Sequence, residues 1–156
     1  MEYTPLKDEK LRNLRKAFGQ LIDKRFTHFH TLDLLHEDNN FERCNDLPII
    51  LFFEEVDPVS ISWSKTEDLA VAFGICLPFG IGGQTTRWVE NDVPELKPLL
   101  KQKLRGVHLA KEATGELWNR IVLTFDSGLM DVFNAGDENG YQFLATKPDY
   151  QLKNVL

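Results

Sequence analysis

The chain has 156 residues, of which 42% are hydrophobic and 27% are charged. These values exclude a chain that is disordered throughout and predict one folded domain over residues 1–156. Charged residues occupy the N-terminus where a signal peptide needs an apolar stretch, and no apolar run reaches the roughly 18 residues of a membrane helix. We therefore expect a cytoplasmic protein without a membrane span.

The net charge of −6 is unevenly distributed along the sequence. Residues 28–96 contain thirteen Asp or Glu against three Lys or Arg. Because a surface of this sign repels phosphate groups, direct binding of nucleic acid is disfavoured. A cationic protein partner is compatible with it.

The first predicted element is an amphipathic helix over residues 6–26, with acidic residues in its first turn, where they face the positive end of the helix dipole. Its apolar residues recur at helical spacing: Leu11, Leu14, Phe18, Leu21 and Ile22.

An imperfect alternation over residues 26–35 and a polar loop over 36–46 come next. Three apolar runs that are rich in β-forming residues follow, separated by short turns, and they predict an antiparallel meander. A glycine-rich loop over residues 78–88 follows the meander. The three predicted strands are residues 47–56, 59–63 and 70–77.

A second helix is predicted over residues 93–104, with Asp92 as its N-cap and Pro94 in its first turn. Gly106 is expected to end this helix. Its core-facing residues are Leu96, Leu99, Leu100 and Leu104.

The last third of the sequence predicts a β-hairpin with a turn at Asp126-Ser127-Gly128. The residues from Asn134 to Gly140 predict a structured turn with Gly136 and Gly140 at positive φ, and the tail is expected to be frayed. The strands expected here are residues 106–110, 120–125, 129–133 and 141–145. Together the elements predict an α+β fold, mainly an antiparallel sheet of about five to seven strands covered by two helices.

No motif for catalysis or cofactor binding occurs in the sequence. Gly80 to Gly83 lack the Lys of a phosphate-binding loop, and Cys44 has no recognisable context of a nucleophile. Glu54 and Glu55 are adjacent, so on a strand they would point to opposite faces and could not share a proton. We expect a protein that is not an enzyme and carries no cofactor.

The histidines suggest an alternative to a protein without a cofactor, namely a metal site. His28 and His30 would project from the same face of a strand, which makes them a workable ligand pair, and His36 lies nearby in the sequence. The tight spacings typical of zinc motifs are missing, so no metal ligand is assigned. Other residues that could complete such a site are Asp33, Glu37, Asp38 and Cys44.

The C-terminal part, from Trp118 on, resembles small bacterial immunity-type proteins of polymorphic-toxin and contact-dependent growth inhibition systems. The resemblance rests on a strand over residues 121–125, an Asp-Ser-Gly turn, a second strand and the segment Asn-Ala-Gly-Asp-Glu-Asn-Gly at 134–140. It implies a protein that binds and neutralises a cognate toxin domain, often a nuclease with a cationic active site.

Three hypotheses follow from these observations. The first is an immunity protein that binds its toxin through acidic side chains, with Trp88 as an aromatic anchor. The second is a metal-dependent or small-ligand enzyme that uses His28, His30 and His36, and the third is a structural or regulatory domain that forms a homodimer through a sheet edge. The candidate contact acids are Glu54, Glu55, Asp57, Glu90, Asp92, Glu95, Asp137 and Glu138.

Overall fold

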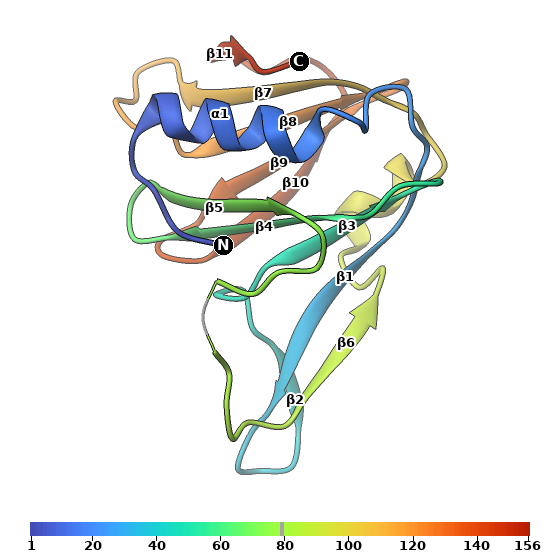
Figure 1. Ribbon diagram of the computed structural model, residues 1–156, viewed down its shortest axis with the longest axis vertical. Helices are drawn as coiled ribbons and strands as arrows, with labels where there is room; N and C mark the ends of the chain where they lie inside the picture. Colours follow the sequence, from blue (N-terminus) through green and yellow to red (C-terminus); the bar gives the residue numbers. More distant parts are fainter. Residues whose placement is uncertain (79) are drawn as a thin grey trace.

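The protein is built of two antiparallel sheets of six and five strands, shown as a computed structural model in Figure 1. The structure describes residues 1–78 and 80–156. The predicted α+β class with mainly antiparallel strands is confirmed. The expected single sheet is in fact two sheets, because residue alternation indicates which face of a strand is buried but not the sheet to which the strand belongs.

The first sheet has the order β2-β1-β3-β4-β5. Strands β2 and β3 pair along one edge of β1, and β6 pairs along the opposite edge. The predicted meander is confirmed as β3, β4 and β5. The first stretch predicted as a loop, 36–46, contains β2, and the second, 78–88, overlaps the start of β6. Both strands pair with β1. Phe79, in the second stretch, lies outside the described residues. The bounds are β1 (Phe26–Leu35), β2 (Phe41–Arg43), β3 (Ile49–Phe53), β4 (Val59–Ser64), β5 (Asp68–Phe73) and β6 (Thr86–Glu90).

The second sheet has the order β10-β9-β8-β7-β11. Its predicted hairpin is confirmed as β8 and β9. The tail expected to be frayed forms β11, which pairs with β7 from Tyr150 opposite Glu112 to Asn154 opposite His108. The bounds are β7 (Leu104–Glu112), β8 (Arg120–Phe125), β9 (Leu129–Asn134), β10 (Asn139–Leu144) and β11 (Tyr150–Asn154).

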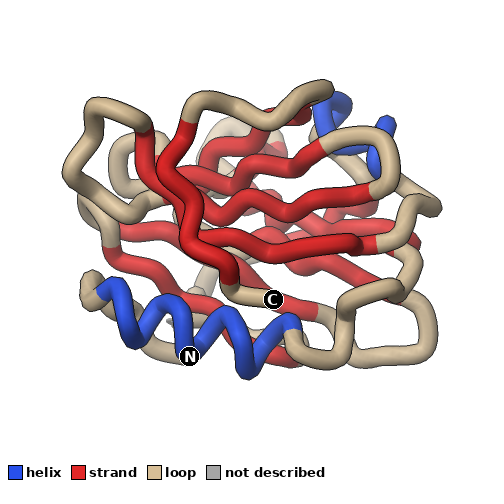
Figure 2. Tube along the Cα trace, turned by 90° about the horizontal axis from the view of Figure 1, so that it is seen from above, coloured by secondary structure: helices blue, strands red, loops and turns tan. Residues whose placement is uncertain are grey.

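The N-terminal helix α1 (Lys7–Phe18) is shorter than predicted because it ends at Gly19, a poor helix former. Leu21, expected on the helix, is still fully buried, whereas Phe26 begins β1. The helix lies along one side of the two sheets, against β5 and β7 (Figure 2).

The second predicted helix is a short 3-10 helix, η1 (Pro94–Leu99), instead of an α-helix over 93–104. Pro98 inside it lacks an N–H and disfavours the α conformation of the preceding residue. Val93, not Asp92, is the N-cap, and Leu104 already belongs to β7.

The main hydrophobic core lies between the two sheets and takes side chains from both. Phe26 is at its centre, with ring centroids 5.5 Å from both Phe53 of the first sheet and Phe125 of the second. Offset aromatic contacts of this kind stabilise a core beyond the area that they bury. The start of β1 is therefore held in the core.

Buried hydrogen bonds join β4 of the first sheet to β9 and β10 of the second. Trp63 donates from its indole Nε1 to the carbonyl of Val132 over 3.0 Å and from its backbone N to Asn139 Oδ1 over 2.7 Å. Asn139 donates in return from Nδ2 to the carbonyl of Ile61 at 3.0 Å. We call this pair of side chains, Trp63 and Asn139, the inter-sheet latch.

The Asn134 to Gly140 turn reinforces the latch. Asn134 Nδ2 donates to the carbonyl of Lys65 at 2.8 Å, and Asp137 Oδ1 accepts from Ser64 Oγ at 3.0 Å and from the backbone N of Lys65. Gly136 has the predicted positive φ of 84°. The second residue with positive φ is Asp137, at 79°, not Gly140, which lies in β10. This turn thus contacts the loop between β4 and β5.

Replacing Asn139 by Ala should lower the free energy of unfolding by about 2–4 kcal/mol, because it leaves the buried N–H of Trp63 and the carbonyl of Ile61 without partners. Urea denaturation measures this loss. The matched change of exposed Asn154 to Ala should cost less than about 0.5 kcal/mol. A loss for Asn139→Ala as small as that of the control would show that the latch does not stabilise the fold.

Lys10 is a fully buried cation on α1. Its Nζ donates to the carbonyl of Trp118 at 2.9 Å, lies 3.6 Å from Glu67 and sits 5.5 Å from the ring centroid of Trp63. Burial lowers the pKa of Lys10 below its ordinary value of 10.5, and Glu67 opposes this shift only in part.

The lowered pKa of Lys10 predicts a stability that rises with pH relative to a Lys10→Met variant. Between the folded pKa and 10.5 the unfolded chain binds more protons than the folded chain, so raising the pH through this window favours folding. Denaturation of both proteins at several alkaline pH values measures the difference. A difference that stays constant or falls up to pH 10.5 would contradict the assignment.

Candidate functional site

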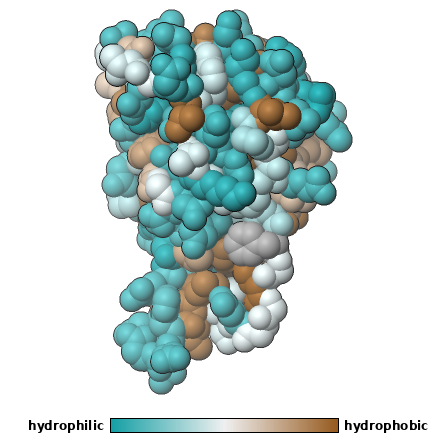
Figure 3. Space-filling model, turned by 90° about the vertical axis from the view of Figure 1, so that its left-hand side faces the viewer, coloured by the Kyte–Doolittle hydropathy of each residue, from teal (hydrophilic) through white to brown (hydrophobic). Residues whose placement is uncertain are grey.

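An arm extends away from the body of the protein (Figure 1). We define it as residues 31–46 and 86–92, which comprise the second half of β1 with β2 and β6. The first half of β1 pairs with β3, and beyond His30 the strand pairs with β6 on one edge and β2 on the other. Figure 3 shows a strip of hydrophobic residues on the arm, with hydrophilic residues along one side and residues of intermediate hydropathy along the other.

Ion pairs hold the strands of the arm together. Asp33 of β1 is buried and accepts from Arg87 of β6 at 3.0 and 3.1 Å, while the guanidinium of Arg87 lies 4.3 Å from the ring centroid of Phe41 in β2. Arg43 of β2 reaches Asp92, just after β6, at 3.2 Å. The three strands therefore form one unit.

The arm carries most of the net negative charge. Its two ranges contain seven Asp or Glu and two Arg, a net charge of −5 out of −6 for the whole chain. Both arginines form ion pairs within the arm, Arg87 with Asp33 and Arg43 with Asp92. Within the described residues, the other five acids lie in no ion pair with a Lys or Arg: Glu37, Asp38, Glu42, Asp46 and Glu90.

Four aromatic side chains lie together where the arm leaves the body, and we call them the aromatic face. His28 stacks on Phe52 with ring centroids 4.2 Å apart, and His30 lies 4.8 Å from Phe52 and 6.3 Å from Trp88. They come from β1, β3 and β6. Trp88 is 41% exposed, so its ring is open to a partner.

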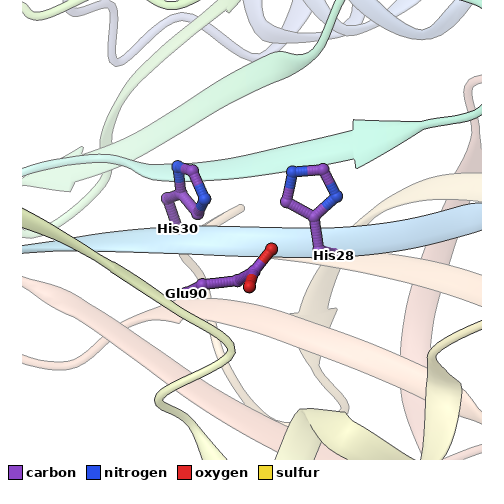
Figure 4. Close-up of side chains that lie close together, drawn as sticks. All are labelled: His28, His30 and Glu90. Carbon is purple, nitrogen blue, oxygen red and sulfur yellow. The ribbon is translucent and has the colours of Figure 1, made fainter.

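Glu90 completes a cluster with His28 and His30 (Figure 4). One potential ligand atom from each residue lies within 4.8 Å of the others. Burial lowers the pKa of His30, the charge of His28 lowers it further, and Glu90 opposes the shift. From the sequence, the histidines are candidate metal ligands and Glu90 is a candidate contact acid, and the fold brings all three together.

The other residues of the metal hypothesis lie elsewhere. His36 follows the end of β1, roughly 20 Å along an extended strand from His30, and its Nε2 lies 3.7 Å from Glu42. Asp33 is paired with Arg87, and the exposed Glu37 and Asp38 belong to the polar turn between β1 and β2. His36 therefore cannot share a metal ion with the two other histidines.

Three of the predicted contact acids outside the arm, Glu54, Glu55 and Asp137, have partners within the chain. Glu54 and Glu55 follow β3 in a turn, where they lie 3.6 Å from Arg25 and 3.5 Å from Lys24, respectively. Asp137 belongs to the turn that supports the latch. Asp57 and Glu95 are exposed, and Glu138 is half-buried.

The glycine loop does not form a phosphate cradle at a helix N-terminus, because it leads into β6. A shallow cleft of about 230 Å³ lies beside it and is lined by Leu34, Leu47, Ile81 and Cys44, among others. Burial raises the pKa of the Cys44 thiol. Since the thiolate is the reactive form, this position does not favour a nucleophile.

A buried ion pair that the sequence analysis missed lies on the outer face of the second sheet. Asp131 is fully buried and accepts from Arg120 at 2.6 Å and from Gln142 at 2.7 Å. The guanidinium of Arg120 lies between the rings of Phe133 and Tyr150, 4.7 and 4.8 Å from their centroids. This packing covers the pair and indicates a structural role.

None of the helices formed by the described residues has the length and apolar character needed to cross a membrane. Comparison of the chain with protein-family models, with curated proteins and with solved structures gave no match.

Proposed function

We propose that the protein is a cytoplasmic immunity-type inhibitor that binds and neutralises a cationic toxin domain through its arm. The observation that carries this proposal is the acidic arm with exposed Trp88 at its base. The inhibitor itself has no catalytic activity and acts by covering the toxin's active site.

The charge of the arm supports this role because it is placed where a partner can reach it. The arm projects from the body, and five of its acids have no Lys or Arg partner among the described residues. A concentrated charge of this kind steers an oppositely charged protein and raises its association rate by roughly 10- to 1,000-fold. Nucleases present such cationic surfaces because they bind phosphate groups.

Trp88 supplies the apolar part of the proposed contact. Tryptophan is enriched among the residues that dominate binding energy, where it is surrounded by polar groups that exclude water. Trp88 lies on the same face as His30 and is followed two residues later by Glu90. We therefore place the centre of the interface on Trp88 and Glu90, and its acidic rim on Glu37, Asp38 and Glu42.

A homodimer through a sheet edge is the second candidate. Strand β5 is an edge of the first sheet, and Phe73 at its end and Ile75 just after it are 37% and 59% exposed. The N-terminus pairs with this edge only at Thr4 opposite Leu69. Light scattering of the purified chain distinguishes the candidates, because a dimer has twice the mass of the 18.0 kDa monomer.

The proposal predicts that co-expression with the toxin domain encoded beside this chain restores growth and yields a stable complex. In that complex Trp88→Ala should weaken binding by about 30-fold or more, the loss of a dominant contact residue. The affinity is measured with a catalytically inactive toxin domain. Failure of rescue by the unaltered chain, with the toxin shown to be active, would refute the proposed function.

Charge reversal tests the role of the arm separately. Glu37→Lys combined with Glu42→Lys should slow association by at least about 10-fold at low salt and leave dissociation nearly unchanged, because exposed rim charges act mainly on the association rate. The matched control reverses two exposed acids of the body, Glu116→Lys with Asp149→Lys. Equal effects of the two pairs would show that net charge, and not the arm, governs binding.

A further inference from the structure

We propose that His28, His30 and Glu90 form a binding site for a Zn²⁺ ion on the surface of the six-stranded sheet, with three protein ligands and an open fourth position. The site shares Glu90 with the proposed toxin interface, but the observations that support it do not depend on toxin binding. It rests on the backbone register, on the hydrogen bonds of His28 and on the packing of the two imidazole rings.

The backbone itself brings the three side chains together. His28 and His30 are two residues apart on β1, and side chains with this spacing project from the same face of a strand. Glu90 of β6 lies directly opposite His30 in the antiparallel register. Such cross-strand pairs have Cβ atoms about 4.5–5.5 Å apart, so the cluster does not depend on one chosen rotamer.

The distances between the three ligand atoms fit a metal ion if they shorten slightly. Zinc binds His nitrogen and carboxylate oxygen at about 2.0–2.2 Å, which places two ligand atoms of a tetrahedral site about 3.4 Å apart. The ligand atoms here lie within 4.8 Å of one another. Because Glu90 is exposed and the histidines are half-buried, rotation of side chains can close this gap without moving the strands.

A second hydrogen-bonding layer prepares His28 as a ligand. Thr27 Oγ1 lies 3.2 Å from the carbonyl of Phe52 and 2.9 Å from His28 Nδ1. When the hydroxyl gives its single proton to the carbonyl, it accepts a hydrogen bond from Nδ1–H of His28. In that arrangement the proton of neutral His28 lies on Nδ1, and Nε2 has a lone pair free for a metal ion. Metal-binding histidines are commonly oriented in this way by an outer partner.

The packing of Phe52 limits the motion of both imidazole rings. Its ring stacks on His28 at 4.2 Å with an interplanar angle of 10° and lies 4.8 Å from His30. Ligands held in place before binding lose less conformational entropy when the ion arrives. Phe52 was not recognised in the sequence because it lies on another strand.

The donor set also suits zinc chemically. Two imidazoles and one carboxylate hold catalytic zinc in several hydrolases and leave a position for water or another ligand. Here the open side of the cluster is the surface, where Glu90 is exposed. Glu90 takes part in no ion pair among the described residues, so a cation would neutralise a carboxylate that is otherwise uncompensated.

Calorimetric titration of the metal-free full chain with Zn²⁺ tests the proposal. We expect one ion per chain. Each of His28→Ala, His30→Ala and Glu90→Gln should weaken binding by more than about 100-fold, the upper end of what loss of an outer partner costs. Thr27→Val, which removes the orienting hydroxyl, should weaken it by about 10- to 100-fold.

His36→Ala is the matched control, since His36 is an exposed histidine of the arm that lies outside the cluster. It should bind Zn²⁺ as the unaltered chain does. Circular dichroism confirms that each variant is folded, and Glu90→Gln retains the shape of the side chain if a histidine variant fails to fold. Absence of stoichiometric binding, or unaltered binding by folded Glu90→Gln, would overturn the proposal.

Discussion

The hydrogen bonds of the latch, from Trp63 to Asn139 and Val132 and from Asn139 to Ile61, are the constraint on which the remaining structure depends. Apolar packing between two sheets is not directional and would tolerate many relative positions. A buried backbone N–H and a buried carboxamide tolerate few relative positions of the sheets, because each polar atom left without a partner costs about 1–3 kcal/mol. Asn139 uses both ends of its carboxamide on β4, and Trp63 returns a bond to β9. The latch therefore fixes how the sheets face each other.

A body fixed in this way allows β1 to carry an arm. Phe26 anchors the start of the strand between the sheets, against Phe53 and Phe125. The second half of β1 leaves the core and pairs only with the short strands β2 and β6. Since the arm does not have to fill the core, its surface can be acidic, and the residues proposed to bind zinc lie at its base together with Trp88.

Local patterns in the sequence predicted the elements whose partners are close in the chain. The hairpin of β8 and β9 has strong alternation around Asp126-Ser127-Gly128, and the meander of β3 to β5 has short turns. The short polar strands β2, β6 and β11 were missed because pairing with a distant strand stabilises them. Pro98 lies inside the second helix, which is a short 3-10 helix where the leucine spacing alone predicted a longer α-helix.

The candidate site was only half predictable for the same reason. The alternation of a strand predicts that His28 and His30 share a face, but no local pattern reveals that Glu90, sixty residues beyond His30 in the chain, lies opposite it. Asp137 is the opposite case, because the sequence indicates a binding residue and the structure shows an internal contact. In the sequence it is an acid on a polar turn, a natural candidate for partner binding, and in the structure its carboxylate accepts hydrogen bonds from Ser64 and Lys65.

Native-state hydrogen exchange measured by NMR tests most directly whether a latched body carries a separable arm. The account predicts that the backbone amides of Trp63 and Asn139 and the indole N–H of Trp63 exchange only with the full free energy of unfolding. The amides of β2 and β6 should exchange through smaller local openings. Exchange of the Trp63 and Asn139 amides as fast as those of the arm would show that the sheets separate locally, and would contradict the account.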